Sequence, residues 1–127
     1  MDVLEVIRLI LLVAHFIGLA GIIGSFLLQS KTKTGLDLRG MLIGVSVQLV
    51  SGALLIGVRQ AADLDVDNIK MAFKLAIAIA VLVAVLIARS RQKKAVAAGT
   101  SEKSVLPWFH TAGALAIVNV IIAVVWI

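Results

Sequence analysis

The feature that most constrains this chain is a series of four long apolar segments that fill most of its length. A helix needs about 20 mainly apolar residues to cross the hydrocarbon core of a bilayer. The 127-residue chain is 61% hydrophobic with a mean hydropathy of +1.13, more apolar surface than a soluble domain of this size buries. The sequence therefore predicts an all-α polytopic membrane protein, a bundle of four transmembrane helices. The helices are expected at about residues 3–29, 38–58, 69–88 and 105–127, within a single domain over 1–127.

Basic residues concentrate in the first and third connecting segments and predict the orientation of the chain. "SKTKTGLDLRG" holds three and "RSRQKKAVAAGTSEKS" holds five, so these segments hold eight of the twelve Lys and Arg residues. The middle segment instead carries Asp63, Asp65 and Asp67, and Asp65 or Asp67 is predicted to cap the third helix. Because Lys and Arg near helix ends stay in the cytoplasm, both termini are expected outside. The third segment is expected to be a solvated connection beside anionic lipid headgroups.

Each predicted helix carries a polar side chain in its outer half. At about 1.5 Å per residue, His15 and Gln48 lie roughly 16 Å deep, Ser51 and Asn119 about 12 Å, and Lys74 about 7 Å. Polar groups within a bilayer are costly and normally face protein, so these five residues form the predicted ligand-binding site. Lys74 is shallow enough either to point into the bundle or to extend to the outer interface.

Small residues accompany these polar residues at helical spacing and predict the packing faces. The predicted packing residues are Gly18, Gly40, Gly44, Gly52, Ala112 and Ala116. Two interpretations of the polar cluster remain open. It either fixes helix packing through interhelical hydrogen bonds of about 0.6 to 2 kcal/mol each, or lines a polar cavity that binds an anion, a lipid headgroup or a proton.

Residues suited to catalysis or cofactor binding are sparse. The chain has no cysteine and only two histidines, so no catalytic residue and no metal site is predicted, and an enzyme is not favoured. His110 is expected at the inner interface beside Pro107 and Trp108, roughly 10 Å or more from His15 in depth. This separation argues against a haem held by both histidines of one chain. No nucleic-acid partner is expected, because the basic residues cluster at the ends of apolar segments.

Four stretches support a resemblance to a known group of proteins. They are "HFIGLAGIIGSFLLQ", "QLVSGALLIG", "NIKMAFKLAIAIAVLVAVL" and "IVNVIIAVVWI". The chain resembles small actinobacterial four-helix integral membrane proteins of no known activity, over all four spans. The shared polar markers are His15, Gln29, Gln48, Lys74, Asn119 and Trp126. The resemblance implies a bacterial plasma membrane and this polar set, without implying any chemistry.

Three functions are compatible with these patterns. The favoured one is a non-enzymatic membrane protein that acts as a homo-oligomer or as an accessory subunit of a larger membrane complex. The second is a small-solute transporter or channel formed by an oligomer, because the inner half of one chain offers only Ser25 and Ser46 as pathway groups. The third is a haem- or quinone-linked electron-transfer protein.

Overall fold

The structure is a computed structural model that describes residues 2–61 and 68–125. Within these ranges the regular secondary structure is entirely helical: α1 (Val3–Leu28), α2 (Arg39–Ala61), α3 (Asn68–Ala98) and α4 (Leu106–Val125). All four helices are long and apolar enough to cross a membrane. The predicted all-α fold with four membrane-spanning helices is confirmed. The predicted helix cap at Asp65 or Asp67 and the marker Trp126 lie outside the described residues.

The third helix extends ten residues beyond the end that the apolar pattern predicts. It continues to Ala98, through a stretch that the sequence analysis assigned to a solvated connection. This stretch contains Arg, Gln, Lys and Ala, which are strong helix formers, and a helix does not have to stop where its apolar run stops. It ends in a Schellman motif, in which Gly99 N donates to Val96 O and Thr100 N donates to Ala95 O. Gly99 has a φ of +65°, which glycine adopts without strain.

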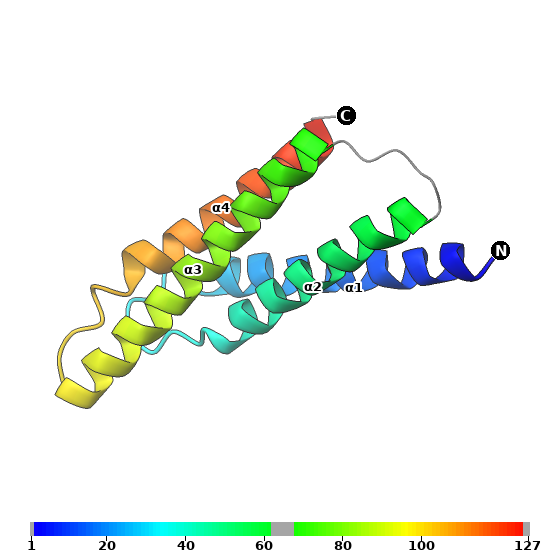
Figure 1. The fold of residues 1–127 in the computed structure, drawn as a ribbon. Coiled ribbons are helices and arrows are strands. Elements are labelled where there is room, and N and C mark those ends of the chain that lie inside the picture. Colours follow the sequence, from blue (N-terminus) through cyan, green and yellow to red (C-terminus); the bar gives the residue numbers. More distant parts are fainter. Residues whose placement is uncertain (1, 62–67, 126–127) are drawn as a thin grey trace.

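The four helices form two pairs, α1 with α2 and α3 with α4. Contacts between the pairs, from α2 to α3 and from α1 to α4, are less extensive. Figure 1 shows that the pairs converge where the two basic connections lie and spread apart toward the opposite side. We call these sides the basic end (residues 29–39 and 89–105) and the terminal end (the start of α1, end of α2, start of α3 and end of α4). The helices that the structure describes therefore form a wedge whose wide side is the terminal end.

Glycines bring α1 and α2 into backbone contact. A Cβ atom on Gly44 would lie 2.7 Å from Gly18 O and 2.9 Å from Ile22 N, and a Cβ on Gly18 would lie 2.8 Å from Gly44 O. A Cβ on Gly40 would approach Ser25 Oγ to 2.6 Å, and one on Gly52 would meet the His15 ring at 3.5 Å. All four glycines of the predicted packing set thus lie on the α1–α2 contact. Close backbone approach of this kind is how small residues hold membrane helices together.

The apolar core lies in the half of the bundle nearer the basic end. Phe109 of α4 is fully buried, and its ring centroid lies 5.5 Å from that of Phe26 on α1. Phe26 in turn covers Gly113 of α4, where a Cβ would overlap its ring. Ala112 and Ala116, the other predicted packing residues, are buried in the same core. This packing holds the helix pairs together at one end.

Hydrogen bonds within and between the two basic connections close the same end. The Gln29 side chain donates to Asp37 O (3.0 Å) and accepts from Asp37 N (2.7 Å). Gln92 Nε2 donates to Leu36 O (2.6 Å) and to Glu102 Oε1 (3.2 Å), while Glu102 Oε2 accepts from Gly35 N (3.1 Å). The expected solvated connection is thus partly helix and partly a strap bonded to the α1–α2 loop.

Candidate functional site

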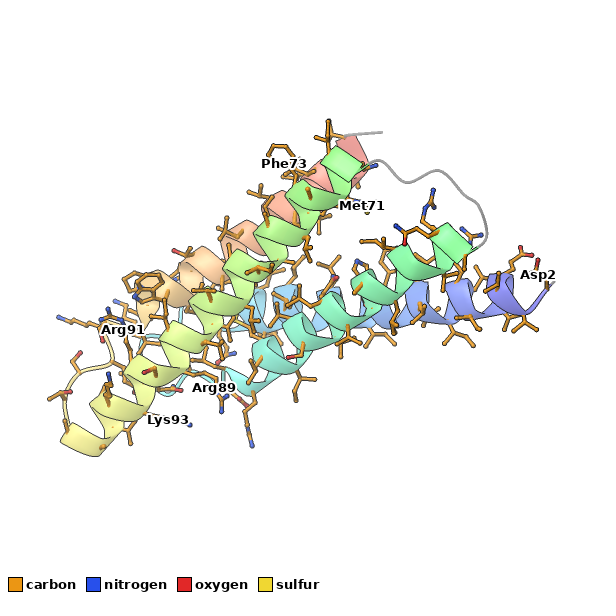
Figure 2. The ribbon with its side chains drawn as sticks, in the orientation of Figure 1. Asp2, Met71, Phe73, Arg89, Arg91 and Lys93 are labelled. Carbon is orange, nitrogen blue, oxygen red and sulfur yellow. The ribbon has the colours of Figure 1, made fainter. Side chains whose placement is uncertain are left out.

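A cavity of about 370 Å³ occupies the space between the helix pairs toward the terminal end, with lining residues from all four helices. It exists because the pairs diverge there (Figure 1). Met71 of α3 points into this space in Figure 2, whereas Phe73 points away from it. Most of the wall is apolar, including Leu12, Leu49 and Val120. The cavity is therefore lined by apolar walls interrupted by a small polar set.

The five predicted site residues come together at this cavity. His15, Gln48, Lys74 and Asn119 line it, one from each helix. Ser51 is buried behind the lining and contacts His15. Of the two orientations left open for Lys74, the structure shows the one in which this residue lines the cavity.

The hydrogen bonds of Ser51 determine how His15 is held. His15 Nδ1 lies 2.9 Å from Ser51 Oγ, and the same Oγ lies 2.6 Å from Val47 O. A hydroxyl has one proton, and a carbonyl oxygen only accepts, so Ser51 donates to Val47 and accepts from His15 Nδ1–H. His15 Nε2 is then the ring nitrogen left to interact with an occupant of the cavity. Gln48 and Asn119 share the cavity with His15, and the acceptor of the Nδ1–H hydrogen bond is Ser51.

Asn119 joins α4 to α3 through a single long hydrogen bond. Its Nδ2 donates to Lys74 O at 3.5 Å. Its Oδ1 is buried and accepts no hydrogen bond from the part of the chain that the structure describes. A buried acceptor without a donor is costly, so the contribution of Asn119 to helix packing rests on its Nδ2 bond.

Two further cations line the cavity and were not among the predicted site residues. Arg8 of α1 and Arg59 of α2 belong to the lining, together with Lys74. Helical spacing carried the signal, because Arg8 precedes His15 by seven residues and Arg59 follows Gln48 by eleven, which are two and three turns. No Asp or Glu occurs among the lining residues that the structure describes. Among the described lining residues, the side chains that carry a fixed charge are Arg8, Arg59 and Lys74, and all three are positive.

The second histidine lies elsewhere. His110 is exposed, and its ring packs edge-on against Phe26 (5.8 Å) and Phe109 (5.4 Å) in the half near the basic end. Within residues 2–61 and 68–125, no three His, Asp or Glu side chains cluster closely enough to hold a metal ion.

The chemistry that the lining of the terminal-end cavity supports is recognition of a ligand through positive charge, hydrogen bonds and apolar contact. Comparison of the chain with protein-family models, with curated proteins and with solved structures gave no match.

Proposed function

We propose that this protein is a non-enzymatic membrane protein that binds an amphipathic anion with a single apolar chain, such as a long-chain carboxylate, in the terminal-end cavity. The observation that supports this most directly is the lining itself, in which three cations and three neutral polar side chains interrupt an otherwise apolar wall. A fixed positive lining selects an anionic head, and the wall offers apolar contact for a chain. The volume of about 370 Å³ lies near the lower end of the range for ligand pockets, which favours one chain over two.

The location of the cavity supports a ligand that comes from the membrane. Lining residues on α1 run from Arg8 to Leu19, a rise of roughly 16 Å along the helix. A cavity that extends this far along an apolar helix supports a location inside the bilayer, between helix pairs that have limited contact with each other. We propose a bacterial plasma membrane with the basic end in the cytoplasm, so that the ligand enters from the outer leaflet.

Binding of a fluorescent polyene fatty acid, cis-parinaric acid, to the full chain in phosphatidylcholine nanodiscs tests this proposal. Hexadecanoate should displace the probe and hexadecanol should not, because only the first carries a charge. Lys74→Gln should weaken binding by about tenfold, as expected for loss of a charge-assisted hydrogen bond. Lys103→Gln removes the same charge at the basic end and should leave binding unchanged. Equal displacement by the alcohol, or wild-type binding by Lys74→Gln, would contradict the proposal.

A further inference from the structure

A second candidate site lies at the opposite end of the molecule. A pocket of about 370 Å³ opens at the basic end, between the start of α2 and the extension of α3. Three of its lining residues are cations: Arg39, Arg89 and Lys93. Its one acidic lining residue is Asp37, which pairs with Arg39 at 3.3 Å, and both side chains of this pair are well exposed. The pocket therefore has a net positive charge.

The three cations come from two helices that the fold holds in a fixed relation. Arg89 and Lys93 are four residues apart, one turn on the same side of α3. Figure 2 shows both on the side of α3 nearer to α2, whereas Arg91 lies on the other side, where its guanidinium stands 5.7 Å from the Trp108 ring. Gln92, between Arg89 and Lys93, donates to Leu36 O and so ties the loop before Arg39 to α3. The positions of these charges are thus set by the strap between the two connections.

The position of Arg89 in the sequence sets the level of this pocket in the membrane. From Ile69 to Ala88, α3 rises about 30 Å, the thickness of a hydrocarbon core; Lys70 and Lys74 lie in its first two turns, and the uncharged run 75–88 follows them. Arg89 is the first residue beyond that run, and Lys93 lies about 6 Å farther along the helix. This is the level of phospholipid headgroups. Leu36 and Leu38, which are buried, form an apolar floor beside the cations.

We propose that the pocket formed by Arg39, Arg89 and Lys93 binds the phosphate of an anionic phospholipid headgroup. Arginine recognises phosphate through paired N–H donors, and lysine adds a point charge. Asp37 orients the Arg39 guanidinium by accepting two hydrogen bonds from it: Arg39 Nε donates to Asp37 Oδ1 (3.3 Å), and Arg39 Nη2 donates to Asp37 Oδ2 (3.4 Å). This site is separate from the terminal-end cavity and does not depend on the function proposed for that cavity.

Native mass spectrometry of the full chain tests the site with three probes: phosphatidylglycerol, phosphatidylcholine of the same acyl chains, and inorganic phosphate. The triple variant Arg39→Gln, Arg89→Gln, Lys93→Gln should bind phosphatidylglycerol at least about tenfold more weakly, because each cation near a membrane surface contributes to the attraction of anionic lipid. The matched control Lys31→Gln, Lys33→Gln, Lys94→Gln removes three charges at the same end but outside the pocket. It should change affinity by less than about twofold.

Equal losses in the two triple variants would overturn the proposal, since they would show diffuse attraction to the basic end. Phosphatidylcholine binding as tight as phosphatidylglycerol would also overturn it. If inorganic phosphate alone competes at millimolar concentration and no lipid is retained, the site binds a free anion and the lipid assignment is wrong. The single variant Lys93→Gln, at an exposed position, serves if the triple variant does not fold, and should weaken phosphatidylglycerol binding by about fivefold.

Discussion

At the scale of single residues, the arrangement of the cavity depends on one hydroxyl proton. Ser51 uses it on Val47 O, so His15 must donate to Ser51. The hydroxyl therefore orients the imidazole ring and selects its tautomer without itself lining the cavity. Ser51 thus acts on the cavity through His15.

Ser51→Ala should destabilise the protein by about 0.6 to 2 kcal/mol, because it removes the acceptor of His15 Nδ1–H within the membrane. Ser46 offers a matched control. Its hydroxyl donates to the carbonyl four residues earlier, Leu42 O (2.8 Å), as that of Ser51 does to Val47 O, but Ser46 is exposed and accepts no hydrogen bond from a side chain that the structure describes. Ser46→Ala should be close to neutral. The measurement is unfolding of both variants in detergent. Equal losses would show that the His15–Ser51 bond contributes nothing.

Asp37 at the basic end predicts a dependence of stability on pH. The side chain and backbone of Arg39 both donate to its carboxylate, and the side-chain bond in particular holds the pKa of Asp37 below its ordinary value of 3.8. Because the folded pKa is the lower one, this stabilisation is fully present above the unfolded pKa and is lost as pH falls through the folded pKa. The wild type should therefore melt higher than Asp37→Asn at pH 6, and the two melting temperatures should converge as the pH falls below the ordinary pKa of 3.8 and through the lower folded pKa. A gap that stays constant with pH would contradict this assignment.

At the scale of elements, the α1–α2 pair is held by backbone contact at two glycines. Gly18 and Gly44 each face the other helix so closely that a methyl group on either would meet carbonyl oxygen. Backbone atoms cannot turn aside as a flexible side chain does, so the helices themselves would have to separate. The contact makes α1 and α2 one unit that forms a single wall of the cavity.

Gly44→Ala should cost about 1 to 3 kcal/mol of stability through this overlap. Gly24→Ala is the matched control, because Gly24 lies inside the same helical pair and a Cβ there meets nothing within 4 Å. Its expected change has the opposite sign, a gain of up to about 0.5 to 1 kcal/mol, since alanine is the better helix former. Thermal unfolding in detergent measures both. Changes of the same sign and size would show that the α1–α2 contact is loose.

At the scale of the whole molecule, the two ends of the bundle differ in construction. The basic end is closed by the Phe26–Phe109 core and by the hydrogen bonds of Gln29, Gln92 and Glu102. The terminal end is open, and its cavity is lined by cations and neutral polar groups. Motion of one helix pair relative to the other would therefore have its pivot at the basic end.

The orientation proposed for this asymmetric molecule is testable with introduced thiols, because the chain has no cysteine of its own. Gln60→Cys places a thiol at an exposed position near the end of α2, and Lys103→Cys places one at an exposed position of the basic end. A membrane-impermeant maleimide should label Gln60→Cys in intact cells and Lys103→Cys only after permeabilisation. The reverse pattern would invert the topology and with it the side from which the cavity is entered.

The sequence was sufficient to predict the number of helices and to identify the polar residues that face the interior of the bundle. A continuous apolar run of about 20 residues has few alternatives to a membrane-spanning helix, and polar side chains inside such runs must face protein. His15, Gln48 and Asn119 could therefore be assigned to one polar cluster by depth and helical face, and the structure adds that the cluster borders a cavity. Local pattern was also sufficient to identify Gly18, Gly40 and Gly44 as packing residues, whereas the structure shows that the helices they join are α1 and α2.

Only the tertiary structure decided how these elements relate to one another. The extension of α3 beyond Ala88 could not be predicted from hydropathy, because hydropathy marks the end of an apolar run. A helix ends where its hydrogen bonds end, here at Gly99. The pairing of His15 with Ser51 depends on which of several polar neighbours lies at the right angle, and depth alone does not distinguish them. The spread of the helix pairs, which creates the cavity and brings Arg8 and Arg59 to it, depends on packing between residues far apart in the chain. Such contacts are properties of the folded bundle, because no single helix contains both partners.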